Sequence, residues 1–104
     1  MAYKVIWSPG SIEDLIAIGE YIERDSPFNA KLVISRFYEL AAKYGRFPRA
    51  STIVPELGNE LYRHKIVYGW RVIYKIDDSA NLIIIITILH SKRQFANIQG
   101  KFLE

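Results

Sequence analysis

The stretch that decides the fold is Leu61–Arg93, which reads LYRHKIV-YG-WRVIYKI-DDSAN-LIIIITIL-HSKR. Its apolar runs are separated by Tyr68-Gly69 and by the segment 77–81, whose residue types tolerate turn geometry. The middle run alternates, which places on one face of a strand the side chains of Trp70, Val72, Tyr74 and Ile76. We therefore expect three consecutive antiparallel strands that end in a cluster of basic and imidazole side chains.

The last run, 82–89, is almost unbroken Leu, Ile and Thr, which is typical of a central strand buried on both faces. Such a strand needs strands beside it and a layer over each face. A tight turn at Tyr68-Gly69 would set Arg63 across from Tyr74 in the preceding hairpin. Because side chains alternate along a strand, Arg71 would then lie on the face opposite Arg63.

The upstream half of the chain predicts a strand and two helices. Segment 3–7 is rich in β-branched and aromatic residues and indicates a first strand. A helix is expected from Ile12 to Arg24, with Ser11 and Asp14 as a variant capping box and an apolar face of Ile12, Leu15, Ile16, Gly19 and Ile22. A second helix follows, with Ser26 as N-cap, Pro27 first and Gly45 as its C-terminal glycine. Segment 46–59 indicates a loop and connector, and 94–104 fits a short helix, a tail or a last strand.

The order is strand, helix, helix and three strands, which predicts an α+β fold, β-α-α-β-β-β, with a helical hairpin packed on a mainly antiparallel sheet. The chain has 104 residues, of which 50% are hydrophobic and 24% charged. This length and composition suit one globular domain over 1–104 that needs no metal or disulfide to support its core.

Composition and charge indicate where the protein is found and what it can bind. The chain has Cys 0, which excludes a disulfide framework and a thiolate site. The N-terminus shows no signal peptide, and the run 82–89 is far shorter than the roughly 20 residues that span a bilayer. We expect a soluble cytoplasmic protein with no membrane contact, no cofactor and no metal. The net charge is +3, with acidic residues gathered in 13–25 and basic ones later, so one surface should be acidic and another basic.

At this point the residues resemble the RelE/ParE superfamily of toxins from bacterial type II toxin–antitoxin (plasmid stabilisation) modules. The resemblance covers Tyr3 to Arg93. It rests on Asp14-Leu15, Ile18 and Tyr21-Ile22 in the first helix, Phe47-Pro48 after the second, Arg63, Trp70 to Tyr74, and Leu89-His90-Ser91-Lys92-Arg93. An Arg, an aromatic strand ending in Tyr and a last strand running into a basic end look closest to the ParE-like branch.

The ParE-like resemblance implies a protein that inhibits DNA gyrase and is neutralised by a cognate antitoxin in a toxin–antitoxin hetero-oligomer. The residues that would contact the target or the antitoxin are Arg63, Lys65, Arg71, Lys92 and Arg93. The alternative is a RelE-like endonuclease that cuts mRNA in the ribosome. In that case alone the catalytic residues would be Arg71, His90 and Arg93, although the chain lacks a tyrosine after Tyr74.

Other interpretations of the same residues stay open. RNA cleavage needs a base, an acid and cations, and His64 or His90 could supply the proton transfer. Each imidazole equally fits an ordinary strand position, and Trp70 and Tyr74 fit core aromatics. A plain nucleic-acid-binding domain would use the late basic residues on phosphates. A pure binding module would take an antitoxin helix beside Arg63 or Arg71.

Overall fold

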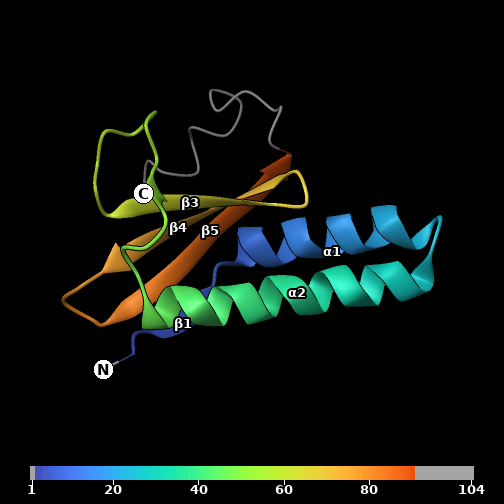
Figure 1. Ribbon diagram of the computed structural model, residues 1–104, viewed down its shortest axis with the longest axis horizontal. Helices are drawn as coiled ribbons and strands as arrows, with labels where there is room; N and C mark the ends of the chain where they lie inside the picture. The colour runs from blue at the N-terminus through green and yellow to red at the C-terminus, as the bar shows by residue number, and fades with distance from the viewer. Residues whose placement is uncertain (1, 91–104) are drawn as a thin grey trace.

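The computed structural model describes residues 2–90 and forms two helices packed on a five-stranded sheet (Figure 1). The elements are β1 (Lys4–Trp7), α1 (Pro9–Glu23), α2 (Pro27–Arg46), β2 (Thr52–Ile53), β3 (Tyr62–Val67), β4 (Trp70–Asp77) and β5 (Leu82–His90). The helices lie side by side as an antiparallel hairpin along the sheet. The predicted α+β class and helical hairpin are confirmed.

The sheet has the strand order β1-β5-β4-β3-β2, with β1 parallel to β5 and every other pair antiparallel. β5 therefore lies inside the sheet, as predicted. Its burial is uneven: Ile83 and Ile85 are buried, whereas Ile84 and Ile86 are half-buried. The expectation that β5 is fully buried on both faces is wrong. Within residues 2–90 both helices cover one face, and the other is covered only in part, by a small cluster around Val54.

One strand lies where the sequence indicated a connector. Thr52 and Ile53 form β2, which pairs with His64 and Arg63 of β3. A strand this short carries no periodic pattern, so its existence depends on the edge that β3 offers. The sheet accordingly has one more strand than predicted.

The hairpin between β3 and β4 has the predicted register. Arg63 faces Tyr74 across the two strands, and Val67 faces Trp70. Tyr68 and Gly69 have φ values of 53° and 78°, the positive angles that a two-residue hairpin turn requires. Arg63 and Arg71 consequently lie on opposite faces of the sheet, as expected.

Helix α1 begins earlier than predicted. Ser8 is its N-cap and accepts a hydrogen bond from the backbone N–H of Ser11 at 3.1 Å, with Pro9 in the first helical position. The predicted capping box at Ser11 and Asp14 is therefore wrong. The Asp14 carboxylate instead accepts hydrogen bonds from the Thr87 hydroxyl at 2.7 Å and from the backbone N–H of Ile88 at 3.0 Å. These contacts join α1 to β5.

Helix α2 begins as predicted, with Ser26 as N-cap and Pro27 in the first turn, but it continues to Arg46. Gly45 is thus inside the helix, and its predicted role as a terminating glycine is wrong. A glycine is needed at position 45 because the chain leading into β1 approaches the helix backbone closely there. The Tyr3 N–H donates to the Gly45 carbonyl at 2.8 Å, and a Cβ on Gly45 would lie 2.5 Å from the Tyr3 carbonyl oxygen.

The main core lies between the helices and the sheet. Tyr74 is fully buried and stacks on Tyr44 of α2, with ring centroids 4.6 Å apart and an interplanar angle of 17°. Trp70 packs at the margin of the same cluster, so both strand aromatics are core residues. Neither helix in residues 2–90 has the length and apolarity needed to span a membrane.

Candidate functional site

Arg71 of β4 is the centre of a charged cluster on the sheet face opposite the helices. Its guanidinium donates to both carboxylate oxygens of Glu56, with Nη1–Oε2 at 2.7 Å and Nη2–Oε1 at 2.6 Å. Its Nε donates to Nδ1 of His64 at 2.7 Å. We call this cluster and its neighbours the Arg71 surface, which comprises Thr52, Glu56, His64, Ile66 and Arg71.

The fold explains how these side chains meet. In the register of β3 and β4, Arg71 faces Ile66 and His64 faces Ile73, so alternation brings His64, Ile66 and Arg71 to one face. Glu56 comes from the turn after β2. The neighbouring Val54 is fully buried, and its N–H donates to the Tyr62 carbonyl at 2.9 Å, which fixes that turn over the sheet.

The electrostatics of the cluster follow from its contacts. The hydrogen bonds from Arg71 lower the pKa of Glu56 from its usual value to about 2, so this carboxylate is ionised at neutral pH. Burial lowers the pKa of His64, and the positive charge of Arg71 lowers it further. His64 is therefore neutral at pH 7, with Nδ1 as acceptor and the proton on Nε2. The cluster can hold a carboxylate in a bidentate, charge-assisted contact.

Arg63 does not belong to this surface. It is 8% exposed, and its guanidinium donates to backbone carbonyls: Nε to Glu60 at 2.7 Å, and Nη1 to Arg49 and Ser51 at 3.1 Å each. Arg63 thus holds the chain between α2 and β3 against the sheet. Its contact with a target or antitoxin stays a prediction, and the burial of Arg63 leaves little of its side chain accessible to a partner.

The other predicted site residues are distributed over both faces. Lys65 is exposed at the edge of the sheet, where it lines a hollow of about 260 Å³ together with Thr52, His64 and Ile66. His90 is exposed at the end of β5, edge-on to Trp70 at 5.4 Å between ring centroids. Lys92 and Arg93 lie outside the described residues.

Two of the three catalytic residues predicted for a nuclease, Arg71 and His90, are not brought together, and the third, Arg93, lies outside the described residues. In the register of β4 and β5, Trp70 faces His90 and Arg71 faces Leu89. Neighbouring residues of a strand point to opposite faces, so Arg71 and His90 lie on different sides of the sheet. Arg71 instead lies beside His64 and Glu56. No local pattern pointed to Glu56, because its contact with Arg71 depends on the path of a loop.

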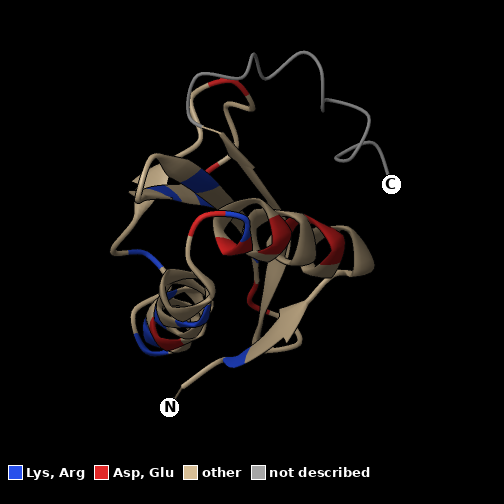
Figure 2. Cartoon of the chain, turned by 90° about the vertical axis from the view of Figure 1, so that its right-hand side faces the viewer, with Lys and Arg blue, Asp and Glu red and all other residues tan. Residues whose placement is uncertain are grey.

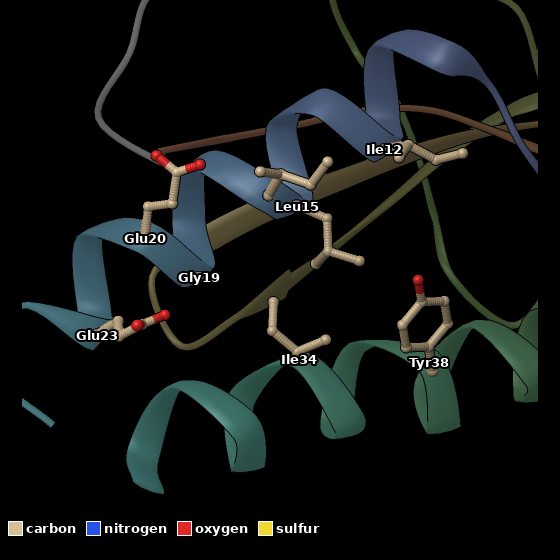
Figure 3. Close-up of a pocket in the computed structure, with 8 residues that line it drawn as sticks. Ile12, Leu15, Gly19, Glu20, Glu23, Ile34 and Tyr38 are labelled. Carbon is tan, nitrogen blue, oxygen red and sulfur yellow. The ribbon is translucent and has the colours of Figure 1, made fainter. Parts of the chain in front are cut away.

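A second surface feature is an apolar groove of about 290 Å³ between α1 and α2 (Figure 3). Ile12 and Ile16 line it and are 43% and 56% exposed, although the sequence placed them on the core face of the helix. Leu15, as predicted, and Ile18 hold the core positions of α1. Glu20 and Glu23 border the groove, and Figure 2 shows that acidic positions predominate along α1.

No group of three or more His, Asp or Glu side chains within residues 2–90 is placed to hold a metal ion. The described residues offer a guanidinium that can bind anions at the Arg71 surface and apolar side chains in the groove between the helices.

The chain matches the family described as the ParE toxin of the type II toxin–antitoxin system parDE over residues 5–95. The match spans most of the sequence and includes β3, β4 and β5. This protein therefore belongs to the ParE toxin family of type II toxin–antitoxin systems. A comparison with curated proteins found no match.

Solved structures share the fold. The chromosomal ParDE toxin–antitoxin system from P. aeruginosa superposes with a TM-score of 0.71 at 15% identity, over 88% of this chain and 98% of that one. The RelBE2 toxin–antitoxin complex from Mycobacterium tuberculosis gives 0.64 at 20% identity, over 86% and 99%. The isolated E. coli RelE toxin gives 0.66 at 12% identity, over 95% of each chain. At these identities the likeness establishes the fold alone.

Proposed function

We propose that this toxin acts in the cytoplasm by binding DNA gyrase and inhibiting it, and that a cognate antitoxin neutralises it in a hetero-oligomeric complex. The observation that carries the proposal is the match to the ParE toxin family over residues 5–95. Several similar structures, including ParDE from P. aeruginosa and RelBE2 from M. tuberculosis, are toxin–antitoxin systems, which supports an antitoxin as partner.

The placement of the charged residues supports a toxin that binds rather than one that cuts. Cleavage of RNA requires a base, an acid and a cation gathered around one phosphate. The register separates Arg71 from His90 by the thickness of the sheet, and Glu56 already occupies the guanidinium of Arg71. A bidentate Arg beside exposed apolar side chains is instead common at the centre of protein–protein interfaces.

An mRNA endonuclease is the second candidate, and one observation favours it. His64 lies on the same face as Arg71 and accepts its Nε–H at 2.7 Å, so an imidazole and a phosphate-binding cation are adjacent. In this version His64 would serve as base in place of His90. Arg71 would bind the scissile phosphate once Glu56 had moved away.

The two candidates separate in a paired assay on the purified toxin, freed of antitoxin and refolded. Under the proposal, the toxin blocks supercoiling of relaxed plasmid by gyrase, and mRNA in a translating extract stays intact. His64→Ala should then weaken gyrase inhibition without abolishing it, because binding is shared among several surface contacts and needs no proton transfer. Cleavage of mRNA that His64→Ala abolishes would establish the endonuclease instead. Absence of gyrase inhibition would refute the proposed target.

A further inference from the structure

The carboxylate of Glu56 fills the position that an acidic side chain of a partner would take on Arg71. We infer that Glu56 is a built-in competitor: a carboxylate of an acidic partner segment displaces it and takes over both hydrogen bonds of the guanidinium. The inference rests on the proposed function only in assigning that acidic segment to the antitoxin. The surface, its ligand chemistry and the competition follow from contacts of the described residues.

Arg71 and Glu56 differ in exposure and in how firmly the rest of the protein holds them. The side chain of Arg71 is 10% exposed, whereas that of Glu56 is 36% exposed, so Glu56 is the more accessible member of the pair. Arg71 is held on a central strand and by His64 at 2.7 Å. Glu56 belongs to a turn whose anchor is the buried backbone and side chain of Val54. Rotation of the Glu56 side chain would therefore make the two N–H groups that it occupies on a preorganised Arg71 available to a partner.

The surroundings indicate what else the partner segment carries. Ile66, on the same face, is 57% exposed, and Tyr68 in the adjoining turn is 63% exposed. Apolar and aromatic side chains around a buried arginine resemble the centre of a protein interface. The hollow between Thr52, His64, Lys65 and Ile66 offers room for one apolar side chain beside the charge. The expected ligand is a peptide segment with a Glu or Asp next to a large apolar residue.

The charge distribution directs an acidic segment to this surface and away from the other exposed apolar region. The groove between α1 and α2 is bordered by Glu20 and Glu23, which would repel carboxylates. Lys65 at the margin of the Arg71 surface would attract them. The two apolar surfaces of the toxin therefore differ in the charge of the partner that each one favours.

Competition makes an unusual prediction for mutation. An ordinary contact residue weakens binding when it is removed, but removal of a competitor strengthens it, because the site no longer has to be vacated. Glu56→Gln should raise affinity for an acidic segment by about two- to fivefold, the range expected for a partly exposed ion pair. Glu56→Asp keeps the charge but reaches Arg71 less well, so its affinity should fall between those of the wild type and Glu56→Gln.

The test titrates the full chain with a fluorescein-labelled peptide of repeating Leu and Glu, followed by anisotropy, beside the same peptide with Gln in place of Glu. We expect binding of the Glu peptide only, strengthened by Glu56→Gln and abolished by Arg71→Ala. Glu60→Gln, an exposed residue in the same loop, removes the same charge and should leave affinity unchanged. Unfolding curves confirm that each variant is folded.

A second readout follows the Nε–H resonance of Arg71 by NMR. This resonance should shift when the Glu peptide is added to the wild type. Glu56→Gln without peptide should not produce the same shift. Unchanged or weaker binding by Glu56→Gln, or equal binding of the Gln peptide, would overturn the competitor role and leave a structural ion pair. Because gyrase inhibition is measured separately, a toxin that fails to inhibit gyrase yet shows this pattern would refute only the proposed function.

Discussion

At the scale of single residues, the stacked tyrosines of the core are chemically unequal. The Tyr74 hydroxyl donates to the Pro48 carbonyl at 2.7 Å. The Tyr44 hydroxyl is buried and has no hydrogen-bond partner among the described residues, and burial raises its pKa to about 12. A buried polar group without a partner costs free energy that a methine would not. The same chemical change should therefore have opposite effects at the two positions.

We predict that Tyr44→Phe raises the free energy of unfolding by about 1 kcal/mol, since it removes a desolvated hydroxyl. Tyr74→Phe should lower it by about 1–3 kcal/mol, because it leaves the Pro48 carbonyl unpaired. Urea unfolding at pH 7 measures both variants under identical conditions. A loss of stability in Tyr44→Phe would mean that its hydroxyl has a partner after all.

His64 makes the stability of the toxin depend on pH. Its pKa in the folded protein is lowered, by burial first and then by Arg71, so the unfolded chain takes up the proton first as pH falls. Stability should therefore be complete above pH 6.5 and decline below it, until the folded-state pKa is reached. Glu56, whose pKa is lowered from 4.5 to about 2, adds to the loss of stability only as pH falls toward 4.5, where the unfolded chain begins to bind its proton.

Urea unfolding at intervals between pH 7.5 and about 5 tests this dependence. His64→Asn places an amide oxygen where Nδ1 accepts the hydrogen bond from Arg71, but it does not titrate. We expect the decline in stability below pH 6.5 to be shallower in this variant than in the wild type. Parallel curves would show that other groups cause the pH dependence.

At the scale of the elements, Gly19 of α1 and Gly45 of α2 differ in how closely other residues approach them. A Cβ at Gly45 would meet the Tyr3 carbonyl oxygen at 2.5 Å and Val5 at 3.0 Å, so the backbone of β1 would have to move. A Cβ at Gly19 would lie 3.4 Å from the flexible end of Ile34, which is ordinary contact. Only Gly45 is required by the packing of a helix against a strand.

Alanine substitution should therefore separate the two positions. Gly45→Ala is expected to lower the free energy of unfolding by about 1–3 kcal/mol, through overpacking against β1. Gly19→Ala should leave it unchanged or raise it by up to about 1 kcal/mol, because alanine is the better helix former. Thermal unfolding followed by far-UV circular dichroism compares them. Similar losses of stability in both variants would show that the close approach of β1 does not distinguish Gly45 from Gly19.

The sequence predicts elements well where the determinants are local. Tyr68-Gly69 fixes the turn and hence the register that places His64 and Arg71 on one face. Ser26 and Pro27 likewise fix the start of α2. Gly45 was misinterpreted because its reason is a contact with Tyr3, distant in sequence, and not helix termination.

The candidate site was only partly predictable for the same reason. Arg71 was identified from its strand, but Glu56 reaches it from a loop whose path depends on the burial of Val54. The separation of Arg71 from His90 depends on the register of β4 and β5. That register is shifted by an irregularity between Ile73 and Tyr74, for which the run of isoleucines in β5 carries no signal.

At the scale of the whole molecule, the fold assigns its two faces to different tasks. The helices and one face of the sheet enclose the main core, and the opposite face carries the Arg71 surface above a smaller cluster of Val54, Ile73 and Leu89. Substitutions at exposed positions of that second face can therefore change binding while the main core stays intact. This separation allows one small domain to combine a stable scaffold with the surface on which, by our inference, Glu56 competes with an acidic partner.

The main core also predicts how the molecule unfolds. Trp7 in β1 packs beside Tyr38 of α2 at 5.1 Å, and Trp70 at the start of β4 packs beside His90 at 5.4 Å, yet both border the same buried cluster. If the chain is one cooperative domain, each tryptophan should report the same transition. In the single-tryptophan variants Trp7→Phe and Trp70→Phe, urea curves from fluorescence and from far-UV circular dichroism should coincide. Separate midpoints within one variant would show that the helical hairpin and the sheet unfold independently, contrary to a single core.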